Sequence, residues 1–397
     1  MKQKRKNIKM KKAAIIPLRK GSKGILGKNK KKMVGRPLFT WVLTEAIFSD
    51  LDLVYVFTDD TEIIEYVERE YHWTTKVKAL LRAEENANDT ASTESVMIEF
   101  SKKIDQDYTI LCLLQATSPL TLAANINASL EKITKDSFDS ALSVVKTHRF
   151  TWNTDGTPHN YDVFNRPRRQ DFDGLLVENG AVYCTTKEAF LQSNNRVSGS
   201  IGLIEMPEET LMEIDSLSDW NIIENLLIER QKTMKVSQRI QYLVLDVDGV
   251  FTDGSVYYNE DGEMAKKFDM RDGMGLEILR ENNVEVVVLT SENSKVVAQR
   301  MKKLKIENVF LGVKDKYSFL KQFLEIKNSS FEFVAYVGDD VNDLSNICSC
   351  GWSFSPANAM NIIKAHADIV LKNNSGNGAI REVCEVIMKY NKRYERV

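Results

Sequence analysis

The chain has 397 residues and a net charge of −2, with 54 Lys and Arg against 56 Asp and Glu. Its hydrophobic content of 43% and charged content of 28% are typical of globular proteins, and the length suffices for two domains that each bury a core. No apolar run reaches about 18 residues and the N-terminus lacks the apolar stretch of a secretory signal, so neither a membrane-spanning helix nor secretion is expected.

Positive charge is concentrated at the N-terminus, where residues 1–36 contain fifteen Lys or Arg and no acid. We expect residues 1–12 to form a solvated basic tail, with nucleic-acid binding or nuclear targeting by the tail as the alternative. No nucleic-acid or membrane partner is expected for the folded domains. The five cysteines form no CxxC pair, which favours free thiols in a reducing, cytoplasmic environment.

The first half of the chain alternates short apolar runs with helical stretches, which predicts an α/β fold with a mostly parallel sheet covered on both faces. The expected strands are 13–18, 53–57, 109–114, 140–145 and 181–186. The expected helices are 37–49, 61–71, 92–104, 121–134 and 219–234. We therefore place one doubly wound domain at 13–234 and a polar linker at 235–239.

The second half repeats this alternation and predicts a second doubly wound domain at 240–397. Its expected strands are 242–246, 284–290, 308–311 and 333–337. Residues 251–268 read as a β-hairpin with a turn at 259–262. Polar residues follow several strands directly, and ligands of open α/β sheets bind beyond the carboxyl ends of the strands.

A basic, glycine-containing loop, RKGSKGILGKN (19–29), follows the first strand. Glycines let backbone N–H groups approach an anion, while Arg19, Lys20, Lys23 and Lys28 supply charge and Ser22 a hydroxyl donor. The spacing is not that of a Walker A loop. It nevertheless suits a folded triphosphate, the alternative being an exposed basic turn.

Other polar segments follow in a fixed order: LRAEENANDTAST (81–93), LLQATSPL (113–120), RPRRQDFDG (166–174) and EIDSLSDW (213–220). Taken alone each is weak, and Asp215 or Ser218 could simply cap a helix. Together with IPLRKGSKG they resemble the CMP-sialic acid synthetases (N-acylneuraminate cytidylyltransferases) over about residues 10–232.

This resemblance implies a nucleotide site, a sugar site and a metal pair. The implied CTP-binding residues are Arg19, Ser22, Lys23, Lys28, Asn29, Arg82 and Thr93. Gln115 and Arg169 match positions that contact the sugar acid, and Glu213 with Asp215 matches the metal pair. The implied reaction is attack of the sugar C2 hydroxyl on the α-phosphorus of CTP with loss of pyrophosphate, assisted by Mg²⁺ and the basic loop.

The most informative stretch is LVLDVDGVFTDG (243–254), a strand that ends in Asp246 with Asp248 two residues later. Like charges this close repel unless a cation lies between them, so the pair predicts a Mg²⁺ site with a nucleophile. Asp246 would attack phosphorus and Asp248 would act as general acid and base, while Thr290 and Lys316 would bind the phosphoryl group. GDDVND would supply the remaining metal site, Asp339 with support from Asp340 and Asp343.

The DxDGVxTDG motif resembles the haloacid dehalogenase superfamily, in its minimal-cap branch of KDO 8-phosphate and sialic acid or KDN 9-phosphate phosphatases. The branch implies a homotetramer and a substrate carboxylate near Arg381. Glu292, where KDO 8-phosphate phosphatases have arginine, and Lys303 eleven residues later match the nine-carbon branch. The resemblance therefore favours a sugar 9-phosphate as substrate, with Glu292, Lys303 and Arg381 as sugar contacts.

The two resemblances together predict a bifunctional enzyme of sialic acid activation that dephosphorylates a sugar 9-phosphate and then joins the product to CMP. Expected partners are these small molecules and further copies of the chain, through the C-terminal domain and through dimer contacts of the synthetase domain. Two alternatives stay open: a non-catalytic C-terminal assembly module, or two domains that both act on KDO.

Overall fold

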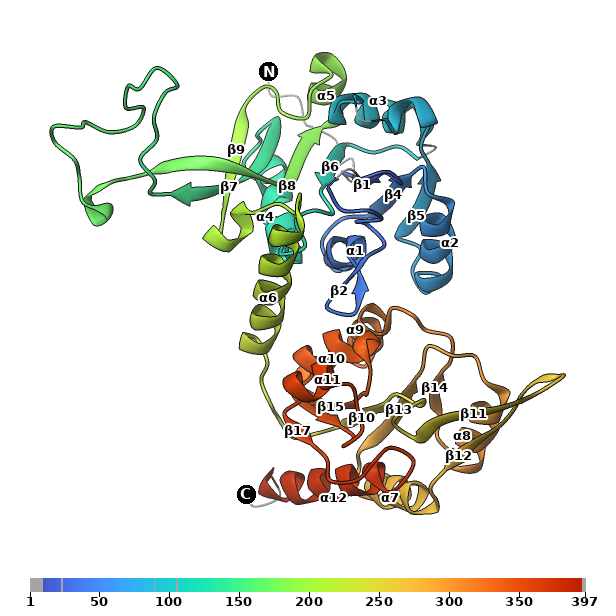
Figure 1. Cartoon of the computed structure of the whole chain (residues 1–397). Helices are drawn as coiled ribbons and strands as arrows, with labels where there is room; N and C mark the ends of the chain where they lie inside the picture. Colours follow the sequence, from blue (N-terminus) through green and yellow to red (C-terminus); the bar gives the residue numbers. More distant parts are fainter. Residues whose placement is uncertain (1–9, 23, 89, 105, 395–397) are drawn as a thin grey trace, which may run out of the picture. The chain divides into compact units, whose positions relative to one another are not determined.

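A computed structural model describes residues 10–394 except 23, 89 and 105 (Figure 1). The chain divides into two compact units. Among the described residues, the first unit comprises those up to Lys31 and Pro37–Leu226, and the second comprises Lys32–Arg36 and those from Leu227 onward. Since the division falls within helix α6 (Leu217–Thr233), the boundaries 13–234, 235–239 and 240–397 stay predictions.

The first unit is built on a seven-stranded sheet in the order β5-β4-β1-β6-β8-β7-β9. Its strands are β1 (Lys12–Leu18), β4 (Leu53–Thr58), β5 (Val77–Leu81), β6 (Ile110–Leu114), β7 (Ser140–Thr147), β8 (Leu175–Thr186) and β9 (Ile201–Met206). All neighbours pair in parallel except β8, which runs against both β6 and β7. The expected mostly parallel α/β fold is confirmed.

Side chains of β1 alternate between two cores, because successive residues of a strand point to opposite faces. Ala14 and Ile16 join the core under α1, α2 and α4, whereas Ala13 and Ile15 join the core under α3 and α5. The helices of this unit are α1 (Phe39–Ile47), α2 (Thr61–Glu70), α3 (Thr93–Lys103), α4 (Ala123–Thr134), α5 (Lys187–Ser193) and α6 (Leu217–Thr233). Its 3₁₀ turns are Glu84–Asn86, Arg169–Asp171 and Glu208–Leu211. The short strands β2 (Lys32–Met33) and β3 (Arg36–Pro37) lie at the segment Lys32–Arg36, which is assigned to the second unit.

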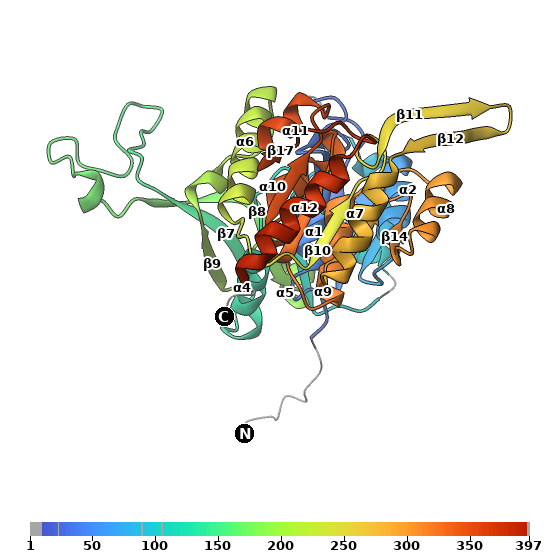
Figure 2. The same ribbon diagram turned by 90° about the horizontal axis from the view of Figure 1, so that it is seen from below.

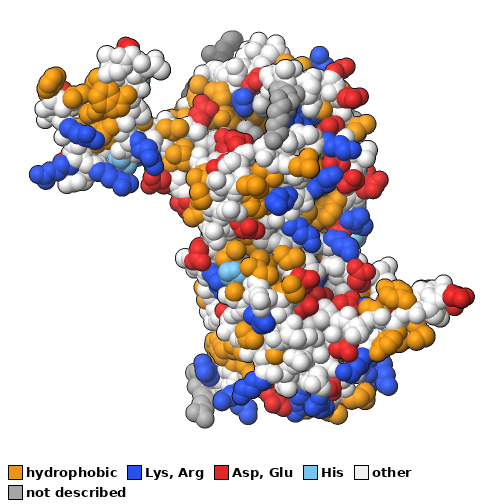
Figure 3. Space-filling model, in the orientation of Figure 1, with side chains coloured by type: hydrophobic (Ala, Val, Ile, Leu, Met, Phe, Trp, Pro, Cys, Tyr) orange, Lys and Arg blue, Asp and Glu red, His pale blue; other side chains and the backbone are white. Residues whose placement is uncertain are grey.

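Strands β7 and β8 extend from the sheet as an arm, with residues 148–174 forming the loop between them (Figure 1). The strand predicted at 181–186 begins earlier, at Leu175. The polar segment ENG (178–180) separates its apolar first residues from the buried run at 181–185, so the sequence shows no continuous strand pattern there. In the space-filling view, hydrophobic and basic side chains lie together on this loop (Figure 3). Phe164 is 100% exposed and Trp152 is 54% exposed.

The expectation of free thiols is wrong for one pair, because Cys112 and Cys184 form a disulfide. They lie directly opposite each other on the antiparallel strands β6 and β8, with Cα atoms 4.2 Å apart. Pairing of these strands is not visible in the sequence, where 72 residues separate the two cysteines. Cys348, Cys350 and Cys384 are free and buried.

The second unit is built on a six-stranded parallel sheet in the order β14-β13-β10-β15-β16-β17. Its strands are β10 (Tyr242–Leu245), β13 (Glu285–Leu289), β14 (Asn308–Phe310), β15 (Val334–Val337), β16 (Trp352–Ser355) and β17 (Ile369–Val370). Its helices are α7 (Met270–Glu281), α8 (Lys295–Lys303), α9 (Lys316–Ile326), α10 (Leu344–Ser349), α11 (Asn361–His366) and α12 (Ala379–Asn391). The 3₁₀ turns are Phe331–Phe333, Val341–Asp343 and Lys392–Tyr394.

Helices α7, α8 and α12 share one core with the sheet, in which Leu243 and Leu245 of β10 take part. Seen from below, α7 and α12 lie side by side and the predicted hairpin projects beyond them (Figure 2). The hairpin consists of β11 (Thr252–Asn259) and β12 (Gly262–Phe268), which pair antiparallel. In the part of the chain that is described, no helix combines the length and apolarity that crossing a membrane requires.

Candidate active sites

A cavity of about 210 Å³ lies where β1 and β6 of the first unit end. The carboxyl ends of these neighbouring parallel strands meet at one edge of the sheet, so the residues after Leu18 and after Leu114 converge. Most of the predicted CTP-binding residues and the predicted sugar contact Gln115 line this one cavity. They are Arg19, Ser22, Lys28, Asn29, Arg82, Thr93 and Gln115, with Pro17, Ala91, Val96, Ala116 and Thr117 completing the lining.

Contacts within the first unit hold the basic loop against the segment before α6. Lys28 Nζ donates to the carbonyl oxygen of Ile214 at 2.6 Å and lies 3.6 Å from Asp215 Oδ1. A Cβ on Gly24 would lie 2.0 Å from the carbonyl oxygen of Asp215, so only glycine allows this approach. Burial lowers the pKa of Lys28, and Asp215 opposes that shift. The predicted loop residue Lys23 lies outside the described residues.

Arg82 forms a buried wall of the cavity and is only 7% exposed. Its Nη2 donates to the carbonyl oxygen of Asn86, while its buried Nε has no hydrogen-bond partner among the described residues. Burial lowers the pKa of Arg82, and Asp59 opposes that shift. A buried cationic donor without a partner at a cavity is an arrangement that an anionic ligand satisfies.

The predicted metal pair of the first unit, Glu213 and Asp215, lies beside the basic loop 19–29. Burial raises the pKa of Glu213, and the charge of Asp215 adds to the shift. Thr117 Oγ1 donates to Glu213 Oε2 at 3.5 Å. Asp215 does not cap α6, because Ser216 and Asp219 form that cap by exchanging hydrogen bonds.

Arg169, a predicted sugar contact, does not line the cavity. It lies in the arm loop with its side chain 75% exposed, and its Nη2 lies 3.7 Å from Glu208 Oε2. The arm carries the 166–174 segment away from the sheet edge where Gln115 lies, and the sequence order alone did not reveal this. Its assignment as a sugar contact stays a prediction.

In the second unit, two aspartates that follow β10 and β15 contact one buried lysine. Lys316, the first residue of α9, places Nζ 2.8 Å from Asp246 Oδ2 and 2.7 Å from Asp343 Oδ1. Tyr336 donates its hydroxyl to Asp343 Oδ1 at 2.7 Å. Burial alone would lower the pKa of Lys316, but the charges of Asp246 and Asp343 raise it, so the ammonium stays protonated.

Carboxylate oxygens of Asp246, Asp339 and Asp343 all lie within 4.8 Å of one another, which is the one such acidic group found among the described residues. Asp339 Oδ1 is buried without a hydrogen-bond partner in the described structure. Burial raises the pKa of Asp339 to about 8 and that of Asp246 to about 7. A Cβ on Gly249 would lie 2.0 Å from Asp339 Oδ2, so glycine leaves the space that this side chain fills. Crowded, buried oxygen ligands of this kind fit a divalent cation.

Asp248 lies outside this acidic group, because its carboxylate bonds to a lysine instead. Lys266 Nζ donates to Asp248 Oδ1 at 2.6 Å from the neighbouring strand β12. A cation shared by Asp246 and Asp248 stays a prediction, since in this structure Asp246 contacts Lys316 and Asp248 contacts Lys266. The sequence did not single out Lys266 as a site residue. It lies two positions before Phe268 in β12, so the two side chains point to the same face of the hairpin, and this spacing could have indicated that Lys266 points inward.

Thr290 follows β13 directly and is 2% exposed, so it lies at the same sheet edge as Asp246. Its Oγ1 accepts a hydrogen bond from the backbone N–H of Glu292 at 3.3 Å. Asp340 is exposed, and its Oδ1 accepts from the N–H of Val341 at 2.6 Å and so caps a 3₁₀ turn.

The predicted sugar contacts of the second unit come from three different segments. Glu292 lies two residues after Thr290 and is exposed, with Oε1 3.2 Å from Lys314 Nζ. Lys303 is the last residue of α8, about 12 Å along the helix from Lys295. Arg381 pairs with Glu385 one turn later in α12, at 2.7 Å. The roles of Glu292, Lys303 and Arg381 as sugar contacts stay predictions.

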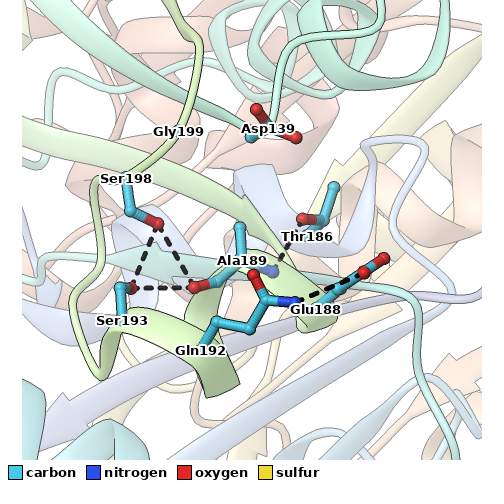
Figure 4. Close-up of a pocket in the computed structure, with 8 residues that line it drawn as sticks. All are labelled: Asp139, Thr186, Glu188, Ala189, Gln192, Ser193, Ser198 and Gly199. Atoms are coloured by element: carbon cyan, nitrogen blue, oxygen red, sulfur yellow. Dashed lines mark hydrogen bonds between the residues drawn. The ribbon is translucent and has the colours of Figure 1, made fainter.

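A second cavity of the first unit, of about 370 Å³, lies away from the predicted nucleotide residues (Figure 4). The two cavities lie at opposite ends of β6. Thr186, which lines the second cavity, pairs with Ile110 at the start of β6, whereas Gln115 of the first cavity follows the end of that strand. Figure 4 shows Ser193, Ser198 and the carbonyl oxygen of Ala189 hydrogen-bonded to one another. These polar groups are hydrogen-bonded to one another, and none of the predicted site residues lines this cavity.

Two family models match the chain, one for each half. Residues 13–217 match the cytidylyltransferase model, and residues 219–383 match the haloacid dehalogenase-like hydrolase model. N-acylneuraminate cytidylyltransferase B of Danio rerio is 31% identical over 395 residues, which cover 97% of this chain and 92% of that protein. N-acylneuraminate cytidylyltransferase of Oncorhynchus mykiss is 31% identical over 96% of this chain and 89% of that protein.

The second half has further relatives. 3-Deoxy-D-manno-octulosonate 8-phosphate phosphatase KdsC of Haemophilus influenzae is 36% identical over 152 residues, which cover 38% of this chain and 84% of that protein. The solved structure of the cobalt-bound phosphatase YrbI from the same organism is 35% identical and covers 39% of this chain and 90% of that chain, with a TM-score of 0.38.

Proposed function

This chain belongs to the N-acylneuraminate cytidylyltransferase family and carries a haloacid dehalogenase-like hydrolase domain, and from this premise we propose that it catalyses two consecutive reactions. The second unit hydrolyses a sialic acid or KDN 9-phosphate, and the first unit transfers CMP from CTP to the released sugar. The observation that carries the proposal is that each unit brings predicted reactive side chains together at a sheet edge: Arg19, Arg82 and Gln115 line one cavity of the first unit, and three aspartates lie close together beside Lys316 in the second.

In the first unit, the task of the chain's residues is to bring two anions together. Arg19, Lys28 and Arg82 offset the charge of the triphosphate, and Ser22 with Asn29 donates hydrogen bonds. Gln115 orients the sugar acid so that its C2 hydroxyl reaches the α-phosphorus, and pyrophosphate leaves. Positioning of this kind supplies most of the rate, because the two reactants repel each other in water.

In the second unit, Asp246 attacks phosphorus and forms an aspartyl-phosphate while the bond to the sugar oxygen breaks. Asp248 gives its proton to the leaving alkoxide and then takes one from the water that hydrolyses the aspartyl-phosphate. Lys316 holds Asp246 in place and offsets the charge that gathers around it. Thr290 donates its hydroxyl to a phosphoryl oxygen.

Asp246, Asp339 and Asp343 are the residues that would hold Mg²⁺ in the second unit, and Glu213 with Asp215 would hold it in the first. When bound, the metal neutralises charge on the phosphoryl oxygens. The buried Asp339 oxygen without a partner supports this assignment in the second unit.

The choice of a 9-phosphate rests on the family of the first unit and on Glu292. A single pathway would supply consecutive substrates to the two units, and an acidic residue at 292 accepts hydrogen bonds from sugar hydroxyls. The relative named as a KDO 8-phosphate phosphatase makes that eight-carbon compound the competing substrate. A non-catalytic second unit is disfavoured, since buried clustered carboxylates stabilise a fold poorly.

We further propose that the chain assembles as a homotetramer. Two exposed apolar surfaces support self-association, the arm loop with Trp152 and Phe164 and the hairpin with Tyr257 and Tyr258. Exposed patches of this kind are typical of protein interfaces. Sedimentation velocity of the full chain checks this directly.

Phosphate release by the full chain tests the phosphatase half of the proposal. Sialic acid 9-phosphate and KDO 8-phosphate are compared at equal concentration in the presence of Mg²⁺. We expect a higher kcat/KM for the 9-phosphate and loss of activity in Asp246→Asn. Preference for KDO 8-phosphate would overturn the substrate choice, and no release from either would leave the second unit as an assembly module.

A further inference from the structure

The side chain of Asp248 is fixed by a buried lysine of the hairpin. Lys266 is 9% exposed, and its Nζ lies 2.6 Å from Asp248 Oδ1. Thr252 Oγ1 lies 3.5 Å from the same oxygen, at the limit of a hydrogen bond. The bond from Lys266 is therefore the strong contact that orients this carboxylate among the described residues.

Lys266 is itself anchored to the loop that carries Thr290. Its Nζ lies 3.6 Å from Glu263 Oε2, and Ser294 donates its hydroxyl to Glu263 Oε1. Ser294 caps α8 by accepting from the N–H of Val297 at 3.2 Å, and it is 3% exposed. The chain Ser294–Glu263–Lys266–Asp248 thus joins the hairpin to the start of α8, whose preceding loop begins at Thr290.

We propose, on the basis of the phosphatase function above, that Lys266 is a positioning residue for Asp248. Lys266 binds Oδ1 and so fixes the Asp248 carboxyl group, whose other oxygen gives its proton to the sugar oxygen and then takes one from water. A buried ion pair adds little to stability compared with apolar packing. A fixed general acid, by contrast, contributes strongly to rate, because small displacements of a reacting group slow proton transfer.

The test replaces Lys266 by Met, which has a similar length and no charge. Lys267→Met is the matched control, because Lys267 is the next residue of β12 and its side chain is 60% exposed. Lys266→Arg keeps a cationic donor. Sialic acid 9-phosphate has a poor leaving group that needs a proton, whereas an aryl phosphate has a good leaving group that does not.

We expect Lys266→Met to lower kcat for the 9-phosphate about 10- to 100-fold with KM changed less than about threefold. Single-turnover release of the aryl alcohol should change less than about threefold, and Lys266→Arg should recover part of the loss. In an Asp248→Asn background, Lys266→Met should slow 9-phosphate hydrolysis by less than about twofold, because the residue it acts through is already gone.

Equal losses on both substrates, or an additive loss in the Asp248→Asn background, would overturn the inference and leave the phosphatase function standing. So would a Lys266→Met rate equal to that of Lys267→Met. If the Met variant fails to fold, Lys266→Gln is put through the same comparison. A wild-type chain that hydrolyses neither substrate would overturn the proposed function, and this inference with it.

Discussion

Replacing Lys316 by Met tests the electrostatics of the second unit, because it removes the ammonium that two aspartates share. Lys316 is 1% exposed and contacts Asp246 at 2.8 Å and Asp343 at 2.7 Å. Met fills most of the volume, so the main change is the loss of charge. Asp246 and Asp343 then remain buried without their cationic partner.

Breaking a buried ion pair by removing one partner destabilises a protein by about 3–5 kcal/mol. We expect a loss in this range from Lys316→Met at pH 8 without divalent cation. In a domain of this size that loss lowers the melting temperature by about 10 °C. Asp343→Asn in the same chain should recover at least about 1 kcal/mol, because it removes one of the two uncompensated charges.

The measurement is urea unfolding and calorimetry of the full chain in EDTA, with the transition of the first unit identified by its response to CTP. Lys327→Met is the control, since Lys327 pairs with Glu285 at 2.8 Å on the surface and should contribute less than about 1 kcal/mol. A Lys316→Met loss as small as that of the control, or a loss that Asp343→Asn deepens, would refute the reasoning.

Three further predictions concern single positions. Gly249→Ala places a methyl group 2.0 Å from Asp339 Oδ2, so the rate of phosphate release should fall at least about 100-fold while CMP transfer is retained. Phosphate release at the wild-type rate would contradict this close fit. Arg82→Met should raise the KM for CTP about 10- to 100-fold, because a buried guanidinium at the cavity is lost; an unchanged KM for CTP would remove Arg82 from the site. Burial raises the pKa of Asp272 to about 6, so its protonated form stabilises the native state below about pH 4 and this stability is lost as pH rises through 6. In unfolding measurements from pH 4 to 8, Asp272→Asn should therefore gain up to about 3 kcal/mol over wild type at the alkaline end, whereas a difference independent of pH would rule out Asp272 as the source.

Residues that follow predicted strands were the easiest to assign from the sequence. Arg19 after β1, Gln115 after β6 and Asp246 after β10 could be placed at sheet edges because apolar strands are recognisable and their carboxyl ends converge. Both sites depend on this rule of parallel sheets. The expected absence of a membrane helix and the location in the cytoplasm rest on composition, and the location stays a prediction.

Contacts that depend on chain pairing were not predictable in the same way. Lys266 reaches Asp248 only because the hairpin folds back across the strand end, and Tyr336 reaches Asp343 from inside β15. The Cys112–Cys184 bond depends on β8 entering the sheet between β6 and β7. Such side chains look like ordinary core or surface residues until the order of the strands is known.

The most direct test of two consecutive reactions in one chain is a single incubation with sialic acid 9-phosphate, Mg²⁺ and CTP labelled at its α-phosphate. Labelled CMP-sialic acid should form with the wild-type chain. With Asp246→Asn it should form only when unphosphorylated sialic acid is added. Product from the 9-phosphate with Asp246→Asn, or none from either sugar with the wild type, would contradict the proposal.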